Sequence, residues 1–255
     1  MATTVRTAPT TKAPMTSTRK TALVAGIFYL VTFVSIPTLG LYDKLKTDPG
    51  GFVTGTGDSS GVLGGCLLEL IVALAGIGTA VTLYPVVKRQ NNGMALGFAA
   101  SRTLEAAMIF VGVLSLYSLV TLKQGLGAGA GDASSLLASS TSLVATYKGT
   151  FLIGQTLMPA INAILLGTLL YRSRLVPRII PIMGLIGAPL LIVSTIAILL
   201  GHNEMGSPWS ALSALPIALW EFSLGVWLLA KGFKPSVITA EMDAEASLHR
   251  DLLAA

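Results

Sequence analysis

The chain has 255 residues, of which 53% are hydrophobic and only 11% are charged. Soluble domains carry about 25% charged residues, so this chain has too few to cover a water-exposed surface, and a soluble globular protein is excluded. The formal net charge of +5 does not indicate a nucleic-acid partner, because the basic residues form no binding face and nearly all flank the hydrophobic segments.

The first 18 residues are rich in Thr and Pro and are predicted to form a disordered cytoplasmic tail. The hydrophobic run at residues 21–41 follows a basic segment, as the apolar core of a secretory signal does. Such a core has only about 7–15 residues, however, and no clear small-residue cleavage site follows this run. The run is therefore predicted to be a retained first membrane helix.

Five further hydrophobic segments follow, at residues 62–87, 94–122, 147–171, 179–200 and 209–230. Each reaches the roughly 20 residues that a helix needs to cross a membrane, although Gln155 and Asn162 interrupt the third of these five. The alternating pattern typical of a membrane β-barrel is absent from the sequence. The predicted fold is an all-α polytopic membrane helix bundle with six transmembrane helices, which form one domain over residues 19–233.

The segments between and after these helices set the predicted orientation. The Gly- and Ser-rich segment 124–142 is predicted to be a flexible external loop, and residues 234–255 a short cytoplasmic tail whose sequence favours a helix. Of the 17 Lys and Arg residues, twelve lie in the tails and in the loops on their side, whereas four lie in the other loops: Lys44, Lys46, Lys123 and Lys148. The positive-inside rule then places both termini in the cytoplasm.

Three blocks of the sequence together resemble one family: TLYPVVKRQNNGMALGFAASRTLEA, LLYRSRLVPRIIPIMGLIGAPLL and LWEFSLGVWLLAKGF. Over about residues 19–233 the chain resembles the bacterial membrane proteins catalogued as domain of unknown function 4386. The resemblance implies a six-helix protein of the bacterial inner membrane. It implies no activity, substrate or catalytic residue, so it supports the fold and leaves the function open.

Four ionisable residues lie inside the predicted helices, namely Glu69, Arg102, Glu105 and Glu221, with Gln155 and Asn162 as polar neighbours. Each such charge costs about 2.5–3.5 kcal/mol on insertion and therefore needs a partner or a function. Arg102 and Glu105 are three residues apart and share a helix face. Arg102 and Glu221 both lie about 12 Å from the predicted cytoplasmic boundary, so they are expected to meet.

Two interpretations of this charge cluster remain open. In the first, Arg102 is a structural clamp whose planar guanidinium binds Glu105 and Glu221 and joins two helices. In the second, the cluster is a working proton or cation site. The four residues carry a formal charge of −2, so at least one glutamate is expected to be protonated, and Glu69 is the first choice because it lacks a cation at its depth. Alternatively, Glu69 faces water or accepts hydrogen bonds from a neighbouring helix.

The leading function hypothesis is a small transporter or channel-like protein with a buried Arg/Glu site, whose small-molecule or ion partner is unknown. The alternative is an accessory or structural membrane protein in which the charges only hold helices together. An intramembrane enzyme is a distant third, because His202 and Glu204 lack further ligands and no catalytic, cofactor or metal site is predicted.

Cys66 is the single cysteine, which excludes an intramolecular disulfide. Besides the lipid bilayer, a homo-oligomer is left open, because a dimer would double the number of helices.

Overall fold

The computed structural model describes residues 15–56, 58–127 and 132–254, and this part of the chain is helical and contains no strand. Six of its segments are long and apolar enough to cross a membrane, so the prediction of an all-α polytopic bundle with six spans is confirmed. Most of the predicted tail, residues 1–14, lies outside the described residues, and helix begins at Ser17.

The first span, Ser17–Leu41, is a broken helix. Helix α1 (Ser17–Val31) is followed by a 3₁₀ turn, η1 (Thr32–Ser35), and then by three short helices: α2 (Thr38–Leu41), α3 (Asp43–Thr47) and α4 (Pro49–Thr54). Pro37 lies at the break between η1 and α2. Proline has no N–H to donate and its ring clashes with the preceding turn, which accounts for the loss of regular helix there.

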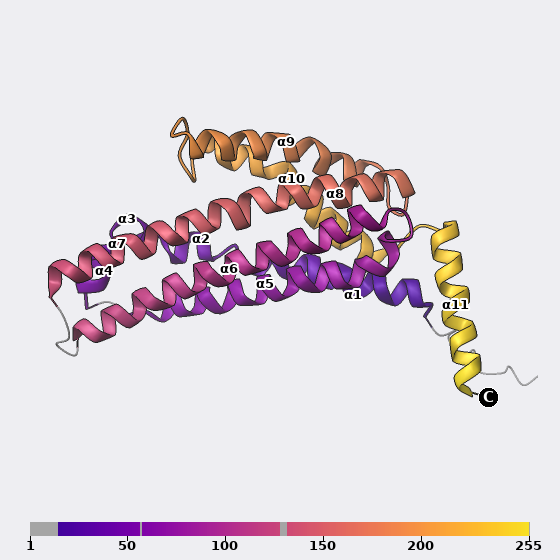
Figure 1. Cartoon of the computed structure of the whole chain (residues 1–255), viewed down its shortest axis with the longest axis horizontal. Coiled ribbons are helices and arrows are strands. Elements are labelled where there is room, and N and C mark those ends of the chain that lie inside the picture. The colour runs from indigo at the N-terminus through magenta and orange to yellow at the C-terminus, as the bar shows by residue number, and fades with distance from the viewer. Residues whose placement is uncertain (1–14, 57, 128–131, 255) are drawn as a thin grey trace, which may run out of the picture.

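The remaining long helices are α5 (Ser60–Val87), α6 (Asn92–Gly127), α7 (Ala133–Thr150), α8 (Met158–Ser173), α9 (Ile179–Leu199) and α10 (Pro208–Ala230), and successive spans run antiparallel (Figure 1). A π-helical segment, η2 (Phe151–Leu157), joins α7 to α8, so these three form one span of 40 residues, Ser134–Ser173. Helix α11 (Val237–Ala254) ends the described chain and occupies the segment for which the sequence favours a helix.

The predicted loop at residues 124–142 is wrong for the part that the structure describes. Residues 124–127 end α6 and residues 133–142 begin α7, whereas residues 128–131 lie outside the described residues. Serine hydroxyls in α7 bond to carbonyls one turn back, as Ser139 does to Ser135 at 2.9 Å. Ser140 and Val144 are buried, and α7 packs against α4 and α6. This tertiary packing overrides the weak helix propensity of the serines.

The two ends of the bundle differ in how far the helices reach. Helix α9 has 21 residues and spans about 32 Å, close to the roughly 30 Å hydrocarbon core, whereas α6 has 36 residues and spans about 54 Å. Figure 1 shows that α3, α4 and the adjoining parts of α6 and α7 project past the ends of α9 and α10. We name this projecting side the far end, and the opposite side, with α1 and α11, the terminal end.

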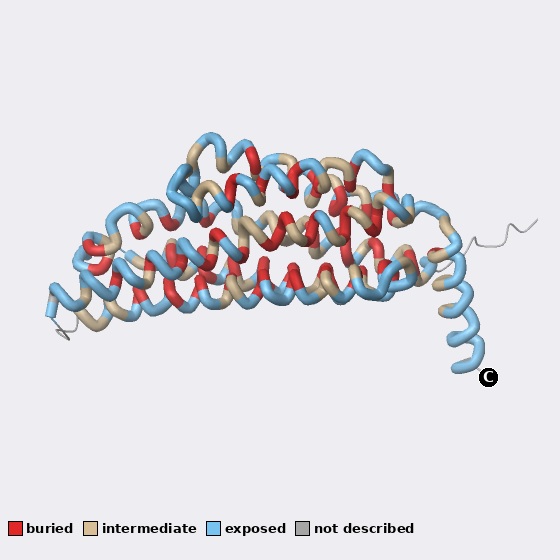
Figure 2. Tube along the Cα trace, turned by 45° about the horizontal axis from the view of Figure 1, so that its top comes forward, coloured by how far each residue is buried: buried red, intermediate tan, exposed pale blue. Residues whose placement is uncertain are grey.

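Two hydrophobic cores follow one another along the bundle. The core near the terminal end contains Tyr29, Phe98 and Trp220, whereas the core near the far end contains Tyr42 and Tyr147. Figure 2 shows that the buried residues lie on the inward sides of the long helices, while most of α11 is exposed. Large apolar residues on the outward sides contact the lipid bilayer, and on α5 these include Leu67, Leu74 and Val81, spaced by seven residues.

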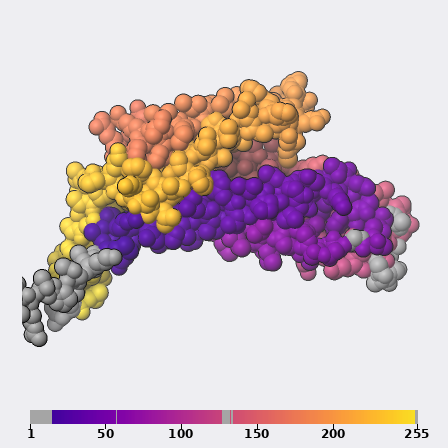
Figure 3. Space-filling model, turned by 180° about the vertical axis from the view of Figure 1, so that it is seen from behind, coloured from indigo at the N-terminus to yellow at the C-terminus, as the bar shows by residue number. Residues whose placement is uncertain are grey.

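The two described ends of the chain are tied together at the terminal end. The backbone N–H and the hydroxyl of Thr18 donate hydrogen bonds to the Asp243 carboxylate of α11, at 2.9 and 2.8 Å. The Arg19 guanidinium donates to the last carbonyls of α10, including Leu228 at 2.9 Å, where a cation also complements the helix dipole. From behind, α10 crosses above α1 and α11 stands at this end (Figure 3).

Candidate functional site

The structure brings three of the four intramembrane charges into one cluster. Arg102 on α6 donates through Nη1 to both carboxylate oxygens of Glu105, at 3.2 and 3.0 Å. Its Nη2 donates to Oε1 of Glu221 on α10 at 2.5 Å. A planar guanidinium serves two carboxylates at once in this way, which a lysine ammonium does less well.

Helices α1 and α8 complete the surroundings of the cluster. The Asn162 side chain on α8 donates to the second oxygen of Glu105 at 2.6 Å. The guanidinium lies 5.4 Å from the ring centroid of Tyr29 on α1 and 6.0 Å from that of Phe98, within the range of cation–π attraction. Four helices therefore meet at Arg102, which is 2% exposed at its side chain.

The sequence positions the cluster through helix length and spacing. Arg102 lies ten residues after the start of α6, about 15 Å along it, and Glu221 lies nine residues before the end of α10, about 14 Å along it. Both helix ends are at the terminal end, so the two side chains lie at one level. Phe98 belongs to the core near the terminal end and Ala106 to the core near the far end, so the cluster lies where the two cores meet.

A cavity of about 600 Å³ leads from the far end to this cluster. At its mouth lie Asp43, Lys46 and Met205, and at its base lie Arg102, Glu105 and Glu221. The side chains of Glu105 and Glu221 are 10% and 13% exposed, respectively, so the carboxylates face the cavity. A second hollow of about 560 Å³, which we name the vestibule, shares Asp43, Lys46 and Met205 with the mouth.

The π-helical segment η2 forms part of the cavity wall through Gln155 and Thr156. A π-helical turn widens the helix and redirects its side chains, and such turns are frequent at functional sites. Gln155 was expected as a polar neighbour of the charges and lies in the wall. The sequence shows no signal for the π-helical geometry, because the residues FLIGQTL, with their single glutamine, are equally compatible with an ordinary α-helix.

On the terminal side of the cluster the bundle is closed. Tyr29, Phe98 and Trp220 are buried to 0–1% exposure and belong to the packed core at that level. Every described residue that lines the cavity lies at the level of the cluster or nearer the far end. Among the described residues, the cavity that reaches the carboxylates therefore extends toward the far end and not toward the terminal end.

Glu69 does not join the cluster. Its side chain on α5 is buried at 1% exposure, and Oε1 accepts a hydrogen bond of 2.8 Å from the Tyr147 hydroxyl on α7. Of the alternatives for Glu69, hydrogen bonding from a neighbouring helix is the one the structure shows, and contact with bulk water is not. The second oxygen, Oε2, has no hydrogen-bond partner among the described residues. Tyr147 also lines the vestibule, so one side chain separates Glu69 from that hollow.

Sequence reasoning missed the tyrosines of both sites. Tyr29 and Tyr147 look like ordinary aromatic residues of apolar helices, and their contacts with Arg102 and Glu69 join segments that are far apart in the chain. The pair His202 and Glu204 gains no third ligand, and the described residues contain no group of three potential metal ligands. Glu204 instead lines the vestibule.

Comparison with known proteins gives one match. The family model described as Domain of unknown function (DUF4386) matches residues 24–232, which includes all three residues of the cluster. No curated protein and no solved structure matches the chain.

Proposed function

The chain belongs to the family described as Domain of unknown function (DUF4386), and we propose that it is a small transporter or channel-like protein. The observation that carries this proposal is the cavity that opens at the far end and stops at Arg102, Glu105 and Glu221. A site within the membrane that is open to one side and closed by packed side chains on the other is the arrangement expected of alternating access. It favours a transporter over a continuously open channel.

The charge at the base of the cavity favours a proton or a small cation as the transported species. One guanidinium and two carboxylates leave a formal charge of −1 at the cluster. A buried excess of negative charge is stabilised by a bound proton or cation, and Glu221, the more exposed carboxylate, is the one nearest to exchange. Arg102 then acts as the fixed counter-charge that holds both carboxylates in place.

The experiment is a flux measurement with purified protein in liposomes, using a trapped pH indicator for protons and radioactive sodium and potassium for cations. Glu221→Gln keeps the side-chain size and removes the charge, and it is expected to abolish a flux that the parent shows. Glu241→Gln, which removes an acid of α11 outside the bundle, is the matched control and should transport like the parent. No flux above protein-free liposomes, or equal flux in Glu221→Gln, would contradict the proposal.

A second candidate is an accessory or structural membrane protein. The observation that favours it is the geometry of Arg102, which joins α6 to α10 while Asn162 adds α8. In this function the same contacts hold three helices together and nothing passes the cluster. A stable protein with no flux, whose stability depends on the pairing of Arg102, supports this candidate over the first.

We also propose that the protein lies in a bacterial inner membrane with both termini in the cytoplasm. The support is the family resemblance and the distribution of basic residues, of which Lys88, Arg89 and Arg178 lie beside helix ends at the terminal end. The cavity then opens to the outside of the cell. A homo-oligomer stays a further proposal, to be tested by the mass of the detergent-solubilised protein.

A further inference from the structure

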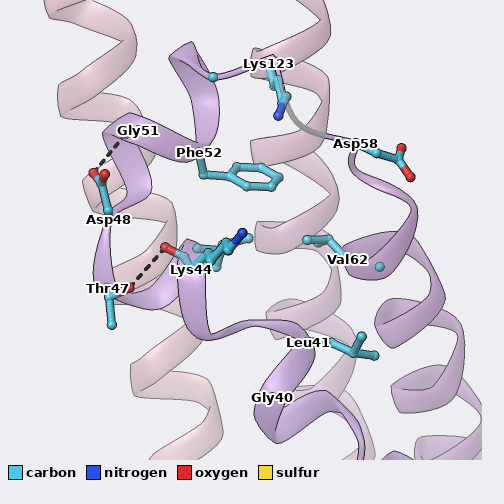
Figure 4. A pocket seen from close by; sticks show the side chains of 13 residues that line it. Gly40, Leu41, Lys44, Thr47, Asp48, Gly51, Phe52, Asp58, Val62 and Lys123 are labelled. Atoms are coloured by element: carbon cyan, nitrogen blue, oxygen red, sulfur yellow. Dashed lines mark hydrogen bonds between the residues drawn. The ribbon is translucent and has the colours of Figure 1, made fainter.

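A separate pocket of about 660 Å³ lies at the far end, between α2, α3 and α4, the start of α5 and the end of α6. We name it the far-end pocket. Figure 4 shows it from close by, with Leu41 and Val62 along one side and Phe52 across from them. Because α3 and α4 project past α9 and α10, the pocket lies outside the level that α9 spans. It shares no lining residue with the cavity at Arg102.

Two ammonium groups point into the far-end pocket. Figure 4 shows the side chains of Lys44 and Lys123 turned toward its interior, on either side of the Phe52 ring. The Nζ of Lys123 lies 4.5 Å from the centroid of that ring, in cation–π contact. In the part of the chain that the structure describes, neither lysine forms an ion pair with an acid.

The acids that border the far-end pocket are engaged by the backbone. Asp48 caps α4 and accepts a hydrogen bond of 2.8 Å from the Gly51 N–H, away from the lysines (Figure 4). Asp58 accepts hydrogen bonds from the hydroxyl and the backbone N–H of Ser60 at the start of α5. These bonds lower the pKa of Asp58, the hydroxyl most of all, so its charge is retained and directed at the helix start. The charge of Lys123 also acts on Asp58, but neither acid forms an ion pair with Lys44 or Lys123 in the described part of the chain.

We propose that the far-end pocket binds a small organic anion, with its carboxylate between Lys44 and Lys123 and its apolar body against Phe52, Leu41 and Val62. Ammonium groups form charge-assisted hydrogen bonds with carboxylates, and a flat apolar body packs on an aromatic ring. Ligand pockets are typically of about 300–1,000 Å³, mostly apolar, with a few polar groups that fix orientation, and the far-end pocket has this composition. The inference does not depend on transport at Arg102.

Benzoate is the probe, because it combines a carboxylate with a flat apolar ring. Equilibrium dialysis of the full chain in detergent should show one benzoate per chain, with an affinity that falls as salt is raised. Lys44→Met and Lys123→Met should each weaken binding about tenfold, the loss expected for one charge-assisted hydrogen bond. Lys148→Met removes the same charge from the vestibule and should bind benzoate like the parent.

A second measurement needs no variant. Amine-reactive labelling read by mass spectrometry should show that benzoate protects Lys44 and Lys123 and leaves Lys148 unprotected in the same chain. Nanodiscs containing anionic lipid, with zwitterionic lipid as the comparison, separate the two sources of such an anion. If anionic lipid protects Lys44 and Lys123 from labelling when no benzoate has been added, the site is supported and its ligand is a lipid headgroup. Absence of benzoate binding, equal binding by the double variant Lys44→Met/Lys123→Met, or protection by inorganic phosphate alone would overturn the inference.

Discussion

At the scale of single residues, Arg102 is the most heavily contacted of the intramembrane charges among the described residues. It is 2% exposed at its side chain and contacts two carboxylates and two aromatic rings. Its removal leaves Glu105 and Glu221 in the membrane without their counter-charge, whereas removal of a matched pair leaves less unpaired charge. Asn162 donates to Glu105 whether or not Arg102 is present. Substitution of Arg102 together with Glu221 therefore measures the contribution of the contact between these two residues.

Arg102→Leu is expected to destabilise the protein by about 3–5 kcal/mol, the usual cost of breaking a buried ion pair. Arg102→Leu with Glu221→Leu is expected to recover much of that loss, because apolar replacement of both partners is often near neutral. The measurement is reversible unfolding in detergent at pH 8. A double variant no more stable than Arg102→Leu alone would show that the contact contributes nothing.

A second residue-scale prediction concerns Glu69. Tyr147→Phe removes the donor to Oε1 and keeps the edge-to-face contact with the Tyr42 ring, whose centroid lies 5.5 Å away. A buried group left without its hydrogen bond costs about 1–3 kcal/mol, so Tyr147→Phe should lower the free energy of unfolding by that amount. Tyr117→Phe, at a ring that is 57% exposed on α6, is the control and should change stability by less than about 0.5 kcal/mol. Equal effects of the two substitutions would contradict the role given to Tyr147.

At the scale of elements, α11 is a long helix with few contacts to the rest of the described chain. It lies across the terminal end with most of its residues exposed, and it is held by Thr18 and by Arg89. Arg89 donates to both carboxylate oxygens of Glu245, at 3.1 and 2.5 Å. Both partners are solvent-exposed, so salt screens their attraction and the pair adds little to the stability of the fold. Its main effect is to fix the position of α11.

The attachment of α11 is expected to depend on pH. Hydrogen bonding to Arg89, with its positive charge, lowers the pKa of Glu245 below the ordinary glutamate value of 4.5. A lowered pKa means that the contact is fully present above pH 4.5 and is lost as the pH falls through the lower value in the folded protein. Spin labels at Ser247→Cys and Asn92→Cys in a Cys66→Ala background should therefore show a defined distance at pH 7 that broadens in acid. Arg89→Gln should broaden it at pH 7 already, and an unchanged distance in that variant would exclude the pair as the attachment.

At the scale of the whole molecule, the two ends of the bundle differ in structure. The terminal end is closed by packed aromatic residues and carries most of the basic side chains, whereas the far end holds the cavity mouth, the vestibule and the far-end pocket. Helices of unequal length produce this difference, because α6 and α7 extend farther toward the far end than α9 and α10 do (Figure 1). Both proposed binding sites therefore open to the same side of the membrane.

Single cysteines in a Cys66→Ala background test this arrangement. Those at Ser59, Ser134 and Asn203 lie at the far end and should react with a membrane-impermeant thiol reagent added outside intact cells. Those at Asn92, Ser173 and Ser236 lie at the terminal end and should react after the membrane is opened. If all six cysteines react with reagent added outside, the six-span topology is wrong. If only those at the terminal end react from outside, the protein has the opposite orientation to the one proposed.

Much of the architecture is determined by the sequence itself. Six apolar segments of sufficient length predict six membrane helices, because in hydrocarbon a helix satisfies its own backbone hydrogen bonds. The three-residue spacing of Arg102 and Glu105 likewise predicts their contact, and the equal depths of Arg102 and Glu221 predict that they meet, because helix rise is constant. These features depend on local geometry, which the order of residues specifies directly.

Only the tertiary structure decided where the remaining polar groups lie. Composition predicted a loop at residues 124–142, but packing against α4 and α6 makes the described part of it helical. The sequence grouped Glu69 with the other intramembrane charges, whereas in the structure its carboxylate accepts a hydrogen bond from Tyr147 on α7. The cavity at Glu221 arises from the different lengths and the breaks of separate helices, including η2 and the interruption at Pro37. Such features depend on how elements distant in the chain are rotated against one another, and no local pattern in a single sequence records that rotation.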